Sequence, residues 1–193
     1  IGRLGNGTHP DDGIYILLKE VIDNAVDEFI MGAGKRVNIS IAEEGGVRIR
    51  DFGRGIPLGK LVDCVSVINT GAKYNTEVFQ FSVGLNGVGT KAVNALSDEF
   101  TVTSFRDGAF SRAFFERGIL KDQEQGETAE KNGVLIEFIP DRSMFPDFSF
   151  NLDFVRKRLW RYAYLNAGLS LYLDDERIYS ANGLLDLLSH EVE

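Results

Sequence analysis

The sequence predicts an α+β fold, a two-layer sandwich in which a mixed, mostly antiparallel β-sheet is covered by helices on one face. Short segments that alternate apolar and polar residues come in adjacent hairpins, and longer segments between them have the spacing of amphipathic helices. The two kinds do not follow one another in strict βαβ alternation, which would favour a parallel sheet. With 193 residues, 44% of them hydrophobic, the chain can bury one sizeable core, so we expect a single domain.

The first half of the chain begins with a predicted helix over residues 14–29, because apolar residues recur there every three or four positions. Residues 37–41 and 47–50 have the two-residue period of strands and predict a hairpin. The other elements expected in this half are, in order, a loop over residues 51–57, a short helix over 61–69, a mobile loop over 70–83 and a helix over 90–96.

The second half of the chain is dominated by strand patterns. Residues 100–105 and 109–115 flank Asp107-Gly108, which is a strong hairpin signal. Residues 118–132 are charged and lack apolar alternation, so we expect a loop there. The remaining elements expected are a strand over residues 134–139, a helix over 152–166, strands over 170–174 and 177–179 at a sheet edge, and a last helix over 184–188.

Composition narrows the class of protein. The net charge of −8 argues against a broad duplex-DNA-binding face, which needs clustered Lys and Arg. The lone Cys64 cannot form an internal disulfide, and no apolar run is long enough to span a bilayer, so we expect a cytoplasmic location without membrane contact. Because the chain starts at Ile1 rather than Met, we expect it to be part of a longer polypeptide.

The most informative segment is Gly84-Leu-Asn-Gly-Val-Gly-Thr-Lys-Ala-Val-Asn-Ala-Leu-Ser97, a glycine-rich turn that runs into a helix. Such a turn can direct backbone N–H groups at a phosphate. A Walker loop does not fit, because Thr90-Lys91 stand in reversed order. Residues 87–92 match the dinucleotide fingerprint G-x-G-x-x-A, but the strand that should precede it is poor, which leaves a dinucleotide-binding fold as a weak alternative.

The polar face of the first helix carries Glu20 and, one turn later, Asn24. An acidic helix face is most often simply exposed to solvent. At this spacing, however, an amide oxygen could bind Mg²⁺ while the carboxylate holds and deprotonates a water molecule.

Asp51-Phe-Gly-Arg-Gly55 places a carboxylate at the end of a strand. An Asp there can accept a hydrogen bond from an exocyclic amine, and the glycines let a flat ring approach the backbone. Taken alone, the segment would slightly favour a simple Asp-rich turn over a binding site.

Taken together, Glu20-Val-Ile-Asp-Asn24, Asp51-Phe-Gly-Arg-Gly-Ile-Pro57 and residues 84–97 resemble the GHKL superfamily, the ATPases that unite gyrase, Hsp90, histidine kinases and MutL. The resemblance implies the Bergerat ATP-binding fold. With Thr70-Gly-Ala-Lys-Tyr74 it is most similar to the B subunits of bacterial type II DNA topoisomerases. The short segment between Pro57 and Thr70 favours the ParE subunit of topoisomerase IV over gyrase B.

The resemblance implies roles for individual residues, with ATP and Mg²⁺ as ligands. Glu20 would be the general base, Asn24 would coordinate Mg²⁺, and Asp51 would bind the adenine amine, with Gly55 against the ring. Arg54 would pair with Glu28 to brace the loop, either as a useful contact or as an exposed ion pair of little energy. The remaining expected contacts are apolar walls at Val21, Ile56 and Ile136, phosphate contacts from Lys73, Leu85, Asn86, Gly87, Val88 and Gly89, and Arg112 at the pocket mouth.

The sequence also departs from the family pattern. Val134 stands where a threonine usually supports the Asp, so we expect that side-chain hydrogen bond to be absent. Asn86 replaces a common histidine. Because the N-terminal dimerisation arm and the transducer domain of the family are not in this chain, we expect a single ATP-binding domain, monomeric and with feeble turnover.

The implied enzyme uses ATP binding to close a dimer gate and hydrolysis to reset it while DNA is passed elsewhere. Its partners would be a second copy of the same polypeptide, an A-type subunit (ParC or gyrase A), DNA through other domains, and adenine-site inhibitors, which are flat heterocycles. A MutL-like or histidine kinase-like ATPase would lack the Ile56-Pro57 and Ala95-Leu-Ser97 signatures. A non-enzymatic interaction domain predicts no Mg²⁺-dependent nucleotide binding, and a dinucleotide-binding oxidoreductase predicts affinity for NAD.

Overall fold

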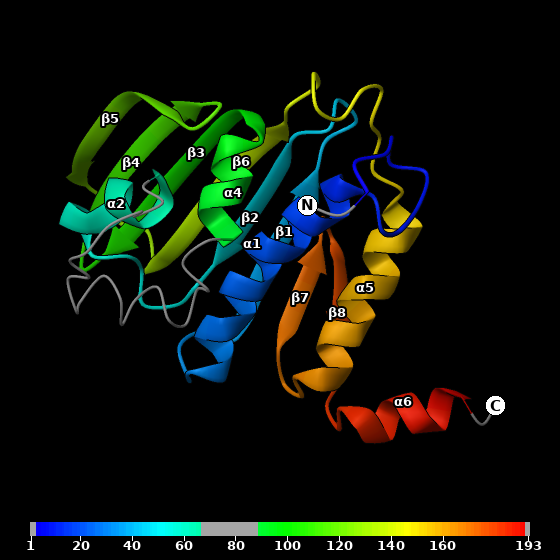
Figure 1. Cartoon of the computed structure of the whole chain (residues 1–193). Coiled ribbons are helices and arrows are strands. Elements are labelled where there is room, and N and C mark those ends of the chain that lie inside the picture. Colours follow the sequence, from blue (N-terminus) through cyan, green and yellow to red (C-terminus); the bar gives the residue numbers. More distant parts are fainter. Residues whose placement is uncertain (1–2, 67–88, 192–193) are drawn as a thin grey trace, which may run out of the picture.

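The computed structural model describes residues 3–66 and 89–191. Their strands form one eight-stranded sheet in the order β5-β4-β3-β6-β2-β1-β7-β8, and helices lie over one face of it (Figure 1). The strands are β1 (Arg36–Ile41), β2 (Val47–Asp51), β3 (Ser97–Arg106), β4 (Ala109–Glu116), β5 (Ile119–Glu127), β6 (Gly133–Pro140), β7 (Ser170–Leu173) and β8 (Glu176–Tyr179). The helices are α1 (Gly13–Ile30), a 3-10 turn (Leu58–Lys60), α2 (Leu61–Ser66), α4 (Gly89–Ala95), α5 (Leu152–Leu165) and α6 (Leu184–Glu191).

The sheet is mixed but mostly antiparallel, as predicted. Only β1 and β7 pair in parallel; every other neighbouring pair among the described strands is antiparallel. The predicted Asp107-Gly108 hairpin joins β3 to β4, with φ angles of 54° and 82° at its two turn residues. Positive φ at both positions is what a type I′ turn requires, and Gly and Asp tolerate it well.

The prediction of a loop over residues 118–132 is wrong for residues 119–127 and confirmed for residues 128–132. A second turn with positive φ, Arg117-Gly118, leads into strand β5, which pairs with β4 along its length. Every residue of β5 is exposed. Because an edge strand with no buried face needs no apolar alternation, its sequence carries no strand pattern, and pairing with β4 supplies the missing stabilisation.

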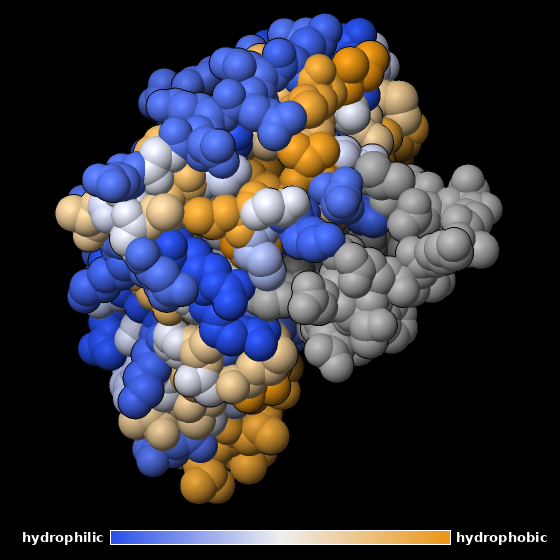
Figure 2. Space-filling model, turned by 90° about the vertical axis from the view of Figure 1, so that its left-hand side faces the viewer, coloured by the Kyte–Doolittle hydropathy of each residue, from blue (hydrophilic) through white to orange (hydrophobic). Residues whose placement is uncertain are grey.

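The core lies between the sheet and the helices that cover it, and α1 contributes the most buried residues. The apolar residues of α1 recur at helical spacing and are nearly fully buried, as at Ile14, Leu18 and Ile22. They face inward-pointing strand residues such as Ile39 and Ile49. On the β5 side the surface is largely hydrophilic, with hydrophobic residues gathered in patches between the charged ones (Figure 2).

The predicted helices are present with small changes at their ends. The predicted helix over residues 61–69 is α2 as far as Ser66, and its last three residues lie outside the described part of the chain, as do the predicted loop over 70–83 and the glycine-rich turn up to Val88. In the part of the chain that the structure describes, no helix is long and apolar enough to cross a membrane.

Candidate functional site

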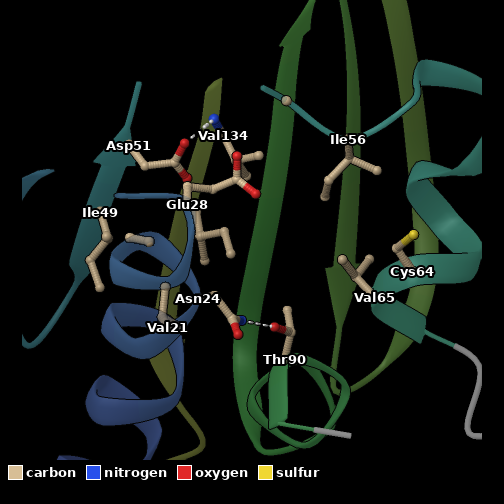
Figure 3. Close-up of a pocket in the computed structure, with 13 residues that line it drawn as sticks. Val21, Asn24, Glu28, Ile49, Asp51, Ile56, Cys64, Val65, Thr90 and Val134 are labelled. Carbon is tan, nitrogen blue, oxygen red and sulfur yellow. Dashed lines mark hydrogen bonds between the residues drawn. The ribbon is translucent and has the colours of Figure 1, made fainter. Parts of the chain in front are cut away.

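A cleft opens between α1, the end of β2, the start of β6, the loop after β2, the second half of α2 and the start of α4 (Figure 3). Helical periodicity brings one face of α1 over it, and the two-residue period of the strands turns Ile49 with Asp51, and Val134 with Ile136, toward the helices. The cleft is mostly apolar, with polar groups at Asn24, Glu28, Asp51 and Thr90.

Asp51 is the buried acid of the cleft, with 8% of its surface exposed. Its Oδ1 accepts hydrogen bonds from the backbone N–H groups of Gly53 (2.9 Å) and Val134 (3.2 Å). No described residue donates a hydrogen bond to its Oδ2. Burial, and secondarily the nearby Glu28, raises the pKa of Asp51 to about 6, although its two backbone hydrogen bonds oppose the shift.

Val134 offers Asp51 only its backbone, as expected of a residue without a hydroxyl. Its backbone N–H still donates to Oδ1 of Asp51, a bond that does not depend on the side chain at this position. Its isopropyl group instead adds apolar surface to the cleft (Figure 3).

Gly55 shapes the loop that leaves β2. It has a φ of 76°, and a Cβ there would lie 2.5 Å from the backbone oxygen of Phe105, closer than atoms can approach. The hydroxyl of Ser104 donates to the carbonyl of Ile56 (2.7 Å), which fixes the next residue of the loop at the cleft wall.

The predicted pairing of Arg54 with Glu28 is confirmed. The carboxylate of Glu28 accepts from Arg54 at the backbone N (2.9 Å), Nε (3.1 Å) and Nη2 (2.8 Å). Glu28 is 8% exposed, so this pair differs from a fully solvated surface ion pair. It ties the loop to α1 beside Asp51.

Glu20 and Asn24 meet the start of α4. A Cβ on Gly89 would lie 2.1 Å from Oε2 of Glu20, so the carboxylate rests against the bare backbone of that glycine. The amide nitrogen of Asn24 donates to Oγ1 of Thr90 (Figure 3). Within the described residues, neither the carboxylate of Glu20 nor Oδ1 of Asn24 forms a hydrogen bond.

The structure therefore brings together Asn24, Asp51, Gly55 and Ile56 as lining of one cleft, with Val21 and Ile136 in its walls. Glu20 lies next to Gly89 but does not line the described part of the cleft. Arg112 does not line it either, because its guanidinium turns across the strands and donates to Thr103 (3.2 Å) and Glu124 (3.2 Å). Lys73 and the predicted phosphate contacts over residues 85–88 lie outside the described residues.

Several residues that line the cleft were not predicted from the sequence, among them Cys64 and Thr90. Cys64 on α2 and Thr90 on α4 both face the cleft. Thr90 stands inside the glycine-rich motif, but a threonine there could also be an ordinary helix residue. Only the packing of α4 against α1 shows that its partner is Asn24. Burial raises the pKa of the Cys64 thiol.

Comparison with known proteins identifies the family. The family model described as "Histidine kinase-, DNA gyrase B-, and HSP90-like ATPase" matches residues 10–138. The chain is 53% identical over 193 residues to the B subunit of DNA topoisomerase 4 from Borreliella burgdorferi, covering 100% of this chain and 32% of that protein. It is 34% identical over 194 residues to the B subunit of DNA gyrase from Mycolicibacterium smegmatis, covering 97% of this chain and 29% of that protein.

A solved structure confirms the predicted fold. The crystal structure of the 43K ATPase domain of Thermus thermophilus gyrase B in complex with an aminocoumarin matches with a TM-score of 0.82 at 28% identity, covering 99% of this chain and 51% of that one. The predicted resemblance to topoisomerase B subunits is confirmed by the same relatives. With a family match over residues 10–138, well over half of its length, the chain belongs to the histidine kinase-, DNA gyrase B- and HSP90-like ATPase family.

Proposed function

We propose that this chain is the ATP-binding and ATP-hydrolysing domain of a type II DNA topoisomerase, in the ParE polypeptide of topoisomerase IV rather than in gyrase B. The observation that carries the proposal is the carboxylate of Asp51, buried at an apolar cleft with one oxygen not engaged by any described residue. The higher identity to a topoisomerase IV relative, 53% against 34% for a gyrase relative, supports the subtype.

In this proposal the chain works as one domain of a longer protein, because it aligns over its whole length with only 32% of a relative. That protein would act in the cytoplasm, where the chromosomal DNA of bacteria lies. Other segments would supply the N-terminal arm and the transducer. ATP binding would close a gate between two copies of the protein, and hydrolysis would reopen it. The A-type subunit and DNA would be engaged through other domains.

Adenine would be recognised by the Asp51 carboxylate. Above its pKa of about 6 this group is an acceptor only, which suits an exocyclic amine and excludes a ring that offers a carbonyl at that position. Val21, Ile56 and Ile136 provide apolar walls for a flat ring. The missing side chain at Gly55 lets the ring approach the loop closely.

The residues present fit a Mg²⁺ ion that arrives with the phosphates. Asn24 would hold it through Oδ1, which accepts no hydrogen bond from any described residue, and amide and phosphate oxygens are the hard ligands that Mg²⁺ prefers. Among the described residues no group of three or more His, Cys, Asp or Glu could bind a metal alone, so the nucleotide would supply further ligands. When bound, the ion offsets phosphate charge.

Glu20 would act as the general base. It stands one turn before Asn24 on the same face of α1, and no hydrogen bond to a described residue occupies its carboxylate. It would orient the attacking water and take its proton as the water oxygen bonds to the γ-phosphorus and the bridging oxygen leaves with the diphosphate. Lys73 and the backbone of residues 85–89 would contact the phosphates.

Replacing Glu20 by Gln in the full-length protein tests this function. The variant should still bind a non-hydrolysable ATP analogue with Mg²⁺, while its ATP turnover falls by about 100-fold or more, the usual worth of a general base. Glu44→Gln, on an exposed turn, is the matched control and should keep both properties. Undiminished turnover in Glu20→Gln would contradict the role of Glu20, and binding of NAD in place of the ATP analogue would contradict the function itself.

A further inference from the structure

Thr90 is a buried polar residue of the cleft to which the proposed function gives no role. It is the second residue of α4, is 7% exposed and lines the same cleft as Asn24 (Figure 3). Its hydroxyl oxygen accepts a hydrogen bond from Nδ2 of Asn24, a residue 66 positions away in the chain. The contact therefore links α1 to α4 at the cleft.

This contact determines which end of the Asn24 carboxamide is available to a ligand. One end of the group is a donor and the other an acceptor, and a half-turn about its last side-chain bond exchanges them. Only the oxygen can bind a cation. By engaging Nδ2, the Thr90 hydroxyl holds the donor end of Asn24 toward α4 and leaves Oδ1 as the end available to a ligand.

We propose that Thr90 is a positioning residue, whose hydroxyl fixes the Asn24 carboxamide with Oδ1 available to the divalent cation that accompanies the nucleotide phosphates. This inference rests on the proposed function. Without the hydroxyl, the carboxamide would have to be oriented at the moment the cation binds. Because a single neutral hydrogen bond is at stake, Mg²⁺-dependent binding should weaken roughly two- to tenfold.

Calorimetric titration of the chain with a non-hydrolysable ATP analogue, with Mg²⁺ and with EDTA, tests the proposal. Thr90→Val keeps the shape but removes the hydroxyl. It should bind the analogue like the native chain in EDTA and show a smaller gain in affinity on adding Mg²⁺. Thr90→Ser should restore the gain, and Thr101→Val, on β3 outside the cleft, is the matched control that should leave it unchanged.

A double substitution shows whether Thr90 acts through Asn24. In an Asn24→Ala background, Thr90→Val should have no further effect on the Mg²⁺ gain. If Thr90→Val does not fold, as judged by thermal unfolding, the smaller Thr90→Ala should give the same result.

The inference is overturned if Thr90→Val keeps the full native Mg²⁺ gain, loses affinity equally in EDTA, or weakens the gain further when Asn24 is already Ala. If the proposed function itself is wrong, the result differs from these three outcomes for the Thr90→Val variant. In that case the native chain itself would bind no ATP analogue, or would bind it without any dependence on Mg²⁺.

Discussion

The backbone N–H of Val134, at the start of β6, donates a hydrogen bond to Oδ1 of Asp51 at the end of β2, with an N···O distance of 3.2 Å. This bond, together with the one from Gly53, holds the carboxylate at the cleft without help from a side-chain hydroxyl. The position of a backbone donor depends on strand register rather than on residue type. The carboxylate of Asp51 is therefore held in place although the side chain at position 134 is apolar.

The buried carboxylate of Asp51 should destabilise the folded chain at neutral pH. The pKa of Asp51 is raised from 3.8 to about 6 on folding, so the folded state binds the proton more tightly than the unfolded state. Its protonation stabilises the fold fully below about pH 4, and that contribution is lost as the pH rises through 6, a change of about 3 kcal/mol at most.

Asp51→Asn should therefore unfold at a higher temperature than the native chain near pH 8, and the difference should shrink toward about pH 4. Thermal unfolding followed by circular dichroism at several pH values measures this. Asp175→Asn, on the exposed β7–β8 turn, is the control and should show no such pH-dependent difference. A native chain that is more stable than Asp51→Asn at every pH would contradict the burial argument.

Adding a hydroxyl at position 134 should strengthen adenine recognition. Val134→Thr is nearly the same size and can donate a further hydrogen bond toward Asp51 or accept one from a bound ring. We expect the affinity for adenosine or an ATP analogue to rise roughly two- to tenfold, the worth of one hydrogen bond. Val134→Ile, which adds bulk but no hydroxyl, should not reproduce the gain; equal effects of Thr and Ile would point to packing instead.

Replacement by Ala should have different effects at Gly55, where it should lower stability, and at Gly89, where it should lower ATP turnover. At Gly55 a Cβ meets the backbone oxygen of Phe105 and the φ of 76° is unfavourable, so Gly55→Ala should destabilise the chain by about 1–3 kcal/mol. At Gly89 the Cβ meets only the end of the Glu20 side chain, which can move.

Gly89→Ala should accordingly fold normally but displace Glu20, lowering ATP turnover of the full-length protein more than its nucleotide affinity. Chemical denaturation and turnover assays separate the two outcomes. Gly59→Ala, where nothing lies within 4 Å of the added atom, should match the native chain in both. A destabilised Gly89→Ala with normal turnover would contradict this assignment.

An aminocoumarin should compete with ATP for the cleft. The T. thermophilus gyrase B ATPase domain has been solved in complex with such a compound, and the chain matches that structure with a TM-score of 0.82. We expect displacement of a fluorescent ATP analogue by the aminocoumarin, and weaker displacement in Asp51→Asn. Simultaneous binding of both ligands would show that the compound occupies another site.

Most of the fold was predictable because the buried positions of a helix or strand recur in the sequence with the period of that element. The alternation in β1 and the three- and four-residue spacing in α1 each reflect one face turned to the core. Strand β5 escaped prediction because it buries no face at all, and its position depends on hydrogen bonding to β4.

The place of a residue in the cleft was predictable where local chemistry dictates the residue type, as at Asp51 and Gly55. It was not predictable where the role depends on what packs opposite. Nothing in the sequence around Thr90 indicates Asn24 as its partner, and nothing around Arg112 indicates that Glu124, on an unpredicted strand, would be near enough to pair with it.

The most direct test of the account is calorimetric titration of a non-hydrolysable ATP analogue with Mg²⁺ into the native chain, Asp51→Asn and Asn24→Ala, with Asp175→Asn as control. We expect saturable binding by the native chain and by the control. Asp51→Asn should lose binding although it is at least as stable as the native chain near neutral pH. Asn24→Ala should lose only the part of the affinity that depends on Mg²⁺. Native binding that neither substitution alters, or no binding by the native chain, would contradict it.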